Sequence, residues 1–277
     1  MTEFLARQER FAVVGSTNDV VRGWLAAGTS EICLAVAGEQ TAGRGRDGRT
    51  WVAPAGGALL LSLGFRPTWL APDRIWQLAA TASLAMAASA EAAAGLAKGA
   101  IRLKWPNDLV VEGRDGVRKL AGVLGETDGL GGPAPRAIIG IGLNTNWMEA
   151  DFPPALAGSM TSLLEASAGR PIDHDVLLDA FLGRLESGVD AMRRGRFDAA
   201  AWTGRQATSG RHIELVAPDG VVTTVRALGV DAGTGALVIE DDSLSTGRQV
   251  LVGEIRHVRV PASSVPSGSG APTAAGV

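Results

Sequence analysis

The sequence predicts an α+β protein with a small all-β unit near its C-terminus. Up to about residue 210, buried strand patterns alternate with long helical patterns. From residue 211 onward, short strands separated by glycine-containing turns replace that alternation. We therefore expect two domains, a larger one at residues 1–210 and a small C-terminal one at residues 211–262. The residues over 263–277 are mostly Pro, Gly, Ser and Ala, and we expect them to form a disordered tail.

Short apolar runs bounded by turn residues predict the strands of the first domain. These runs lie at 11–14, 32–37, 58–65, 120–126 and 137–143. Segment 101–111 divides into two strands, because Pro106 cannot donate a backbone hydrogen bond to a sheet. Two glycines interrupt the run at 137–143, and glycine within a strand often marks close approach of a ligand.

Helical spacing of apolar residues and capping residues predict four helices in the first domain. They are expected from about 18 to 27, over 72–94, over 173–194 and over 197–202. The first follows Ser16 and Thr17, whose hydroxyls have two possible roles. They cap the helix, or they face a ligand at its N-terminus.

Five short strands separated by turns predict a small β-barrel in the second domain. Their expected ranges are 212–216, 221–228, 236–240, 249–252 and 256–260. Residues 211–260 contain no aromatic side chain, which argues against base stacking on this unit.

The composition excludes several classes of protein. A chain of 277 residues that is 46% hydrophobic can bury an ordinary core, and its formal net charge of −3 argues against a nucleic-acid-binding role. No export signal and no long apolar span is evident, so we expect a cytoplasmic protein without membrane contact. Cys33, the only cysteine, lies in an apolar run and is predicted to be a core residue. The three histidines are too far apart in sequence to suggest a zinc site.

Residues 43–51, the arginine loop, alternate three glycines with three arginines and end at Trp51. Guanidinium groups bind carboxylates and phosphates, and glycine allows close approach of the backbone to a ligand. The loop is therefore either a mobile segment that closes on an anionic substrate or a solvated basic loop. Its glycines also match the G-x-G-x-x-G pattern, but residues 49–54 are a poor start for a helix, so we do not expect a dinucleotide site.

Only three of the 26 basic residues are lysines, namely Lys98, Lys104 and Lys119. A lysine that is kept in such an arginine-rich chain suggests that its position requires an ammonium group.

Five stretches together resemble the ordered motifs of biotin protein ligases. They are residues 16–18, Gln40 with the arginine loop, residues 104–108, residues 119–122 and residues 140–144. The resemblance covers residues 11–260. It implies a mixed-sheet, class II synthetase-like catalytic domain followed by an SH3-like barrel. Because the chain begins almost at the Ser-Thr-Asn motif, we expect no N-terminal DNA-binding domain, no DNA binding and no repressor function.

The resemblance also implies a two-step reaction. Biotin and ATP first give biotinyl-5′-AMP and pyrophosphate, and a lysine of a biotin carboxyl carrier domain then takes the biotin and releases AMP. The carrier domain belongs to acetyl-CoA carboxylase or to another acyl-CoA or pyruvate carboxylase. Both reactants of the first step are anions, so the site needs positive charge more than a general base. Closure of the arginine loop over the adenylate would exclude water.

By resemblance, each motif residue is expected to have a role. The catalytic residues are Lys119, Arg44, Arg46 and Asp108. The biotin-binding residues are Ser16, Thr17, Asn18, Gln40, Gly43, Arg44, Arg46, Lys119, Gly122 and Gly140. The ATP-binding residues are Arg46, Arg49, Trp51, Lys104, Asn107 and Asn144. Asp108 either binds Mg²⁺ through phosphate or steers the acceptor lysine. Lys104 either supports the corner at 104–108 or contacts a phosphate.

Two alternatives remain open at this stage. A lipoate–protein ligase-like acyl-adenylate transferase has the same fold and adenylation chemistry, although the arginine loop and the 104–108 corner favour biotin. A non-catalytic anion-binding or nucleic-acid-binding module would release no pyrophosphate on addition of biotin and ATP.

Overall fold

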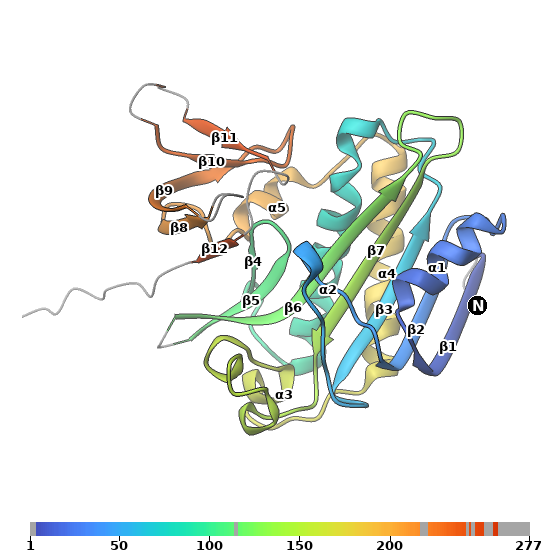
Figure 1. Cartoon of the computed structure of the whole chain (residues 1–277), viewed down its shortest axis with the longest axis horizontal. Coiled ribbons are helices and arrows are strands. Elements are labelled where there is room, and N and C mark those ends of the chain that lie inside the picture. Colours follow the sequence, from blue (N-terminus) through green and yellow to red (C-terminus); the bar gives the residue numbers. More distant parts are fainter. Residues whose placement is uncertain are drawn as a thin grey trace, which may run out of the picture.

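The computed structural model describes residues 4–113, 116–216, 221–241, 244, 247–251 and 257–259. Seven strands form one mixed sheet in the order β1-β2-β3-β7-β6-β5-β4 (Figure 1). Their bounds are β1 Arg7–Val14, β2 Cys33–Gln40, β3 Ala58–Phe65, β4 Ile101–Lys104, β5 Asp108–Gly113, β6 Gly116–Asp128 and β7 Arg136–Asn144. The β1–β2 pair is parallel and the other neighbours are antiparallel, so the predicted mixed sheet is confirmed.

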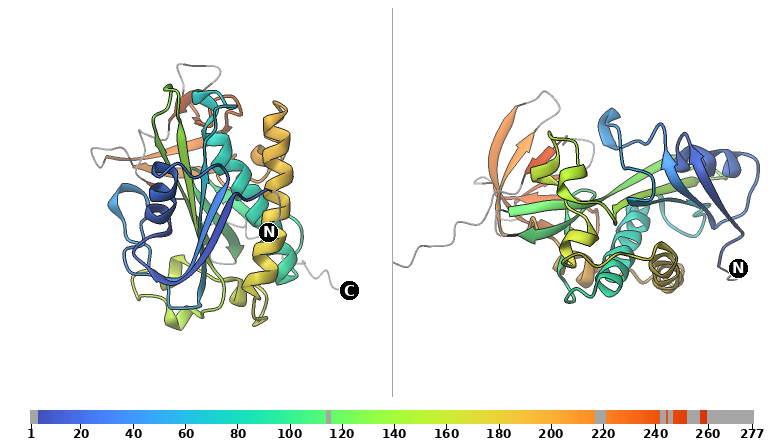
Figure 2. Two further views of the ribbon diagram at one scale, coloured as in Figure 1. Left: turned by 90° about the vertical axis from the view of Figure 1, so that its right-hand side faces the viewer. Right: turned by 90° about the horizontal axis from the view of Figure 1, so that it is seen from below.

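Helices cover both faces of this sheet (Figure 2). The helices are α1 Thr17–Ala26, α2 Trp76–Ala94, α3 Leu163–Ala166, α4 His174–Arg193 and α5 Ala199–Gly204. In the left view of Figure 2, α2 and α4 lie on one side of the sheet and α1 lies on the other. All eight residues of β3 are buried, because this strand is covered on both faces. None of the helices in the described residues is both long enough and apolar enough to span a membrane.

A second, antiparallel sheet follows α5. Its strands are β8 His212–Val216, β9 Val222–Val230, β10 Leu237–Ile239, β11 Arg248–Val250 and β12 His257–Arg259, in the order β11-β10-β9-β8-β12. The prediction of five strands is confirmed. Within the described ranges, no hydrogen-bonded pairing joins β11 to β12, so the strands form an open sheet and not a closed barrel. The predicted tail at 263–277 lies outside the described residues.

Trp105 connects the two sheets. It follows β4 of the main sheet, yet its indole belongs to the buried apolar cluster of the second sheet, with Ile213 and Leu237. Its Nε1 donates a hydrogen bond of 2.9 Å to the carbonyl oxygen of Gly235, in the turn before β10. The corner at residues 104–108 is therefore fixed from the side of the second sheet.

Candidate functional site

A cavity of about 600 Å³ lies on the face of the main sheet that carries α1. The N-terminus of α1, the arginine loop, the β4–β5 corner, strands β6 and β7, and residues 147–160 all contribute to its wall. Most of the predicted site residues come together here. Those lining the cavity are Ser16, Thr17, Asn18, Gln40, Arg44, Arg46, Arg49, Trp51, Lys104, Asn107, Asp108, Lys119, Gly122 and Gly140.

Two predicted site residues, Gly43 and Asn144, do not line it. The backbone of Gly43 pairs with Trp51 at the base of the arginine loop, where an added Cβ would lie 2.5 Å from the Trp51 carbonyl oxygen. Asn144 is fully buried, and its amide nitrogen donates to the carbonyl oxygen of Thr161. Neither residue faces the cavity, but each stabilises a segment next to its wall: Gly43 the base of the arginine loop, and Asn144 the backbone at Thr161.

One end of the cavity is a buried cluster of hydroxyl and amide groups. Gln40 Oε1 accepts hydrogen bonds from the backbone nitrogen of Thr17 at 2.7 Å and from its hydroxyl at 3.0 Å. Ser62 lies 2.7 Å from the Thr17 hydroxyl and 2.5 Å from Asn18 Oδ1. A Cβ on Gly140 would lie 2.2 Å from that same Asn18 oxygen, so only glycine leaves room for the amide. This end can offer both donors and acceptors to a polar ring.

The hydroxyl of Ser16 does not cap α1. Ser16 occupies the N-cap position, but its side chain forms no capping hydrogen bond. The Thr17 hydroxyl bonds to Gln40, on a different element. Both residues line the cavity, so the interpretation of a ligand-facing helix N-terminus is favoured over simple capping.

The arginine loop has a defined shape. Arg44 and Thr50 form an isolated antiparallel bridge, and a 3₁₀ turn over Arg46–Gly48 closes the tip. Gly48 has φ of +73°, a conformation that glycine adopts without strain. Backbone hydrogen bonds join Gly45 N to Arg49 O and Trp51 N to Gly43 O. The loop is thus a short hairpin that extends over the cavity.

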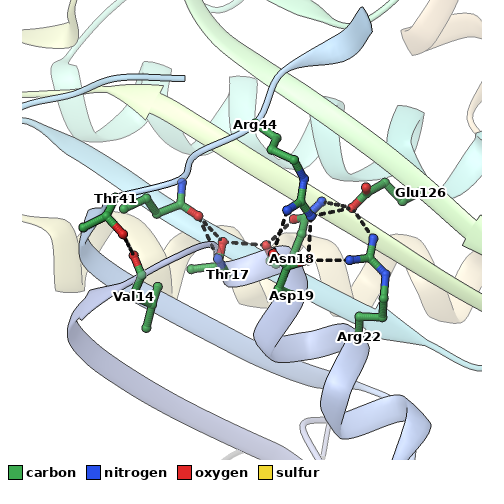
Figure 3. A network of polar contacts seen from close by, with 10 residues as sticks. Val14, Thr17, Asn18, Asp19, Arg22, Thr41, Arg44 and Glu126 are labelled. Carbon is green, nitrogen blue, oxygen red and sulfur yellow. Dashed lines mark hydrogen bonds and ion pairs between the residues drawn. The ribbon is translucent and has the colours of Figure 1, made fainter. Parts of the chain in front are cut away.

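Four charged side chains form an ion-pair ring beside the cavity: Asp19, Arg22, Arg44 and Glu126 (Figure 3). The guanidinium of Arg44 makes two hydrogen bonds to Asp19, of 2.6 and 2.7 Å. Arg22 Nη1 lies 2.5 Å from Asp19 Oδ1, and Arg22 Nη2 lies 2.9 Å from Glu126 Oε2. Arg44 Nη2 lies 3.7 Å from the same Glu126 oxygen. The hydrogen bond from Arg44 lowers the pKa of Asp19 and raises that of Arg44.

Lys119 and Asp108 meet at the other end of the cavity. The ammonium of Lys119 lies 2.7 Å from Asp108 Oδ1. That buried oxygen accepts no hydrogen bond of regular geometry from the described residues, so the ion pair with Lys119 is the contact that compensates its charge. Asn107 attaches the corner to β6, because its amide nitrogen donates to Val123 O and its backbone oxygen accepts from Val123 N.

The indole of Trp51 lies on paired glycines of the sheet. Gly122 of β6 and Gly142 of β7 face each other in register. A Cβ on Gly142 would lie 2.5 Å from the indole, and one on Gly122 would lie 3.2 Å from it. The two glycines therefore let the end of the arginine loop contact the strands closely, and Lys119 Nζ lies 5.6 Å from the indole centroid.

The sequence prediction missed one wall of the cavity. Residues 147–160 contribute Trp147 and Met160, which pack with Phe152 in a small apolar cluster that also contacts Trp51. Trp147 is 96% buried, yet its indole nitrogen has no hydrogen-bond partner among the described residues. This segment has no regular periodicity that could have predicted its position. Ser62, in contrast, carried a signal as the one hydroxyl within the apolar run at 58–65.

Among the described residues, no group of three or more His, Cys, Asp or Glu side chains could hold a metal ion. Among the cavity-lining residues whose side chains the structure describes, Asp108 is the only one with a carboxylate. A cation that arrives bound to a substrate could therefore contact the carboxylate of Asp108 here.

The chain is similar in sequence and in fold to known proteins. A model of the biotin/lipoate A/B protein ligase family matches residues 11–144. The chain is 31% identical over 253 residues to the biotin–[acetyl-CoA-carboxylase] ligase of Mycobacterium tuberculosis, a match that covers 90% of this chain and 88% of that protein. It is 37% identical over 161 residues to the bifunctional ligase/repressor BirA of Bacillus spizizenii. That match covers 58% of this chain but only 47% of the longer relative.

Solved structures share the fold. A biotin protein ligase from Aquifex aeolicus, in complex with biotin and ATP, superposes with a TM-score of 0.74 at 24% identity. The superposition covers 92% of this chain and 99% of that one. This likeness confirms the predicted α+β class, with a large mixed sheet and a small C-terminal antiparallel sheet.

Proposed function

Because the chain belongs to the biotin/lipoate A/B protein ligase family, we propose that it is an ATP-dependent biotin–protein ligase. In the first step, a carboxylate oxygen of biotin attacks the α-phosphorus of ATP, which gives biotinyl-5′-AMP and releases pyrophosphate. In the second step, the amine of an acceptor lysine attacks the carbonyl carbon of this mixed anhydride, and AMP leaves. The name of the mycobacterial relative supports a carrier domain of acetyl-CoA carboxylase as the acceptor.

The observation that carries this proposal is the meeting of two chemically different ends in one cavity. The biotin ureido ring has one carbonyl acceptor and two N–H donors, which Thr17 and Gln40 can complement, with the Ser62 hydroxyl behind them bonded to Thr17. Ser16, Asn18 and Gly140 complete the wall around that end, and Gly122 lines the cavity nearer to Lys119. A volume of about 600 Å³ is typical of small-molecule sites.

The cationic end suits the reacting anions. Biotin carboxylate and the α-phosphate repel each other, and a fixed positive charge that contacts both lowers the barrier to their approach. We assign this role to Lys119 and Arg46, which line the cavity beside the corner and on the arginine loop. Arg44 also lines the cavity, but its guanidinium contacts Asp19.

The nucleotide would occupy the region between the arginine loop and residues 147–160. We assign Arg49, Lys104 and Asn107 to its phosphates and ribose, and Trp51 to its base. The buried indole nitrogen of Trp147 can donate to a ring nitrogen of the base. Asn144 would support this region indirectly, since its amide holds Thr161.

Mg²⁺ would enter on the phosphates of ATP. Mg²⁺ typically keeps several waters and contacts one or two carboxylates besides phosphate, so Asp108, from the described wall of the cavity, fits as a protein contact. When bound, the ion neutralises charge on the leaving pyrophosphate. The same carboxylate, released from Lys119, could instead orient the acceptor lysine.

All cavity-lining residues lie before residue 161, which supports residues 1–210 as the biotin- and ATP-binding domain. Residues 211–262 would form a second domain around the small antiparallel sheet. We propose that the reaction takes place in the cytoplasm.

Biotin-dependent exchange of labelled pyrophosphate into ATP tests the first step directly. The expected result is exchange with biotin and Mg²⁺, little exchange with lipoate, and incorporation of biotin into an added carrier domain. Exchange with lipoate but not with biotin would favour the lipoate ligase-like alternative. No exchange with either acid would leave an anion-binding module as the better interpretation.

A further inference from the structure

We propose that Asp19 is a positioning residue that anchors the arginine loop through Arg44, so that Arg46 is directed into the cavity. The inference concerns how the proposed ligase prepares its site, and it therefore rests on the proposed function. Asp19 itself does not line the cavity.

The geometry of the contact is that of an anchor. Arg44 Nη1 lies 2.6 Å from Asp19 Oδ2, and Nη2 lies 2.7 Å from Oδ1. Two parallel hydrogen bonds between a guanidinium and a carboxylate fix both the distance and the orientation of the groups. Asp19 stands in the first turn of α1, and α1 packs on β2, β3 and β7. The loop is thus attached to a rigid part of the fold.

The rest of the ion-pair ring strengthens this attachment. Arg22 contacts both Asp19 and Glu126, and Glu126 accepts a further hydrogen bond from the Asn18 amide at 2.5 Å. Each carboxylate of the ring therefore contacts two guanidinium groups. Figure 3 shows that these side chains converge from α1, the arginine loop and β6.

The charge of the ring argues that a substrate anion does not displace Asp19. Two arginines and two carboxylates sum to zero. An incoming carboxylate that took Arg44 from Asp19 would leave one guanidinium between two carboxylates, a net charge of −1 beside the new anion. Such a like-charge contact is unfavourable, although partial exposure of the ring screens it. Asp19 is therefore expected to keep its contact with Arg44 when biotin binds.

The anchor acts on Arg46 through a short tether. Only Gly45 separates Arg44 from Arg46, and two residues span at most about 7 Å. Fixing Arg44 on α1 keeps Arg46 within reach of the cavity that it lines. The part of the loop left free to respond to ligand begins after Arg44.

The test compares Asp19→Asn with Asp175→Asn in the full-length protein. Asp175 is also an acidic residue in the first turn of a helix and also pairs with an arginine, at 2.6 Å, but this arginine, Arg10, belongs to β1 and not to the arginine loop. In Asp19→Asn, the amides of residues 43–50 should exchange about three- to tenfold faster without ligand, and biotin should bind about three- to tenfold more weakly. Asp175→Asn should change neither quantity.

A double-mutant cycle isolates the route through Arg44. In an Arg44→Gln background, Asp19→Asn should add little to the exchange of residues 43–50, since the anchor is already lost. Tighter biotin binding by Asp19→Asn would overturn the proposal, because it would make Asp19 a competitor of the substrate. Unchanged exchange, or an additive cycle, would overturn it as well. The exchange measurements need no ligand, so they remain decisive even if the wild-type protein fails to bind biotin.

Discussion

The ammonium of Lys119 lies 2.7 Å from the carboxylate of Asp108, and the two residues reach the cavity from the neighbouring strands β6 and β5. The pair combines a fixed positive charge with a group that can hold it in position before substrate arrives.

Lys119→Ala should lower the rate of biotinyl-adenylate formation by about 10²–10³-fold, the usual effect of losing one donor aimed at developing charge. Single-turnover formation of biotinyl-5′-AMP measures this rate. Lys98→Ala is the matched control, because Lys98 is an exposed lysine outside the cavity. A rate like that of the wild type, in a variant with unchanged Tm, would remove Lys119 from the catalytic residues.

Gly142→Ala should weaken biotin binding at least about tenfold, since a Cβ at this position would lie 2.5 Å from the Trp51 indole and force it to move. Gly125→Ala, on the adjacent strand β6, meets only Ile139 Cδ1 at an ordinary 3.7 Å and serves as the control. Calorimetric titration with biotin gives both affinities. Equal affinities for the two variants would show that the position of Trp51 does not matter for biotin.

Trp105→Phe should destabilise the protein more than Trp76→Phe does. Trp105 is buried and Trp76 is partly buried, but only Trp105 donates a hydrogen bond, to Gly235 O, whereas the indole nitrogen of Trp76 has no hydrogen-bond partner in the described structure. The difference should be about 1 kcal/mol in the free energy of unfolding, the net value of one hydrogen bond. Urea unfolding of both variants measures it, and a larger loss from Trp76→Phe would contradict the assignment.

The free energy of unfolding should fall as the pH decreases from about 7 to 5, partly through His174. Burial lowers the pKa of His174, whose Nε2 lies 2.7 Å from the Thr145 hydroxyl. Because the folded protein then binds this proton less readily than the unfolded chain does, the stabilisation is complete above pH about 6.5 and is lost below it. His174→Gln should flatten this part of the stability profile. An unchanged slope would mean that other groups cause it.

Sequence patterns predicted those helices and strands whose local sequence carries a clear signal, such as a continuous apolar run or a glycine at the helix end. The eight-residue run at 58–65 is β3 to the residue, because a continuous apolar segment of that length is buried on both faces. Gly95 ends α2 with φ of +65°, as a C-terminal glycine does. Cys33 is buried as predicted, and its burial raises the pKa of the thiol to about 11.

Features that depend on distant contacts could not be predicted in this way. Strand β1 begins at Arg7, well before the predicted start at residue 11, because it pairs in parallel with β2 regardless of its own mixed pattern. The ion-pair ring joins residues that are up to 107 positions apart in the chain, from Asp19 to Glu126. The wall at residues 147–160 owes its position to the packing of Trp147 and Met160 near Trp51. No periodic pattern in the local sequence indicates this packing.

Trp105 and Asp108 stand three residues apart on opposite sides of one rigid corner. The first belongs to the apolar interior of the C-terminal sheet, and the second contacts the ammonium that we assign to the chemistry. Only three peptide units therefore separate the interior of the small sheet from the carboxylate partner of Lys119. A macromolecule that docks on that sheet would have a direct mechanical route to the reacting groups, without any signal crossing the main core.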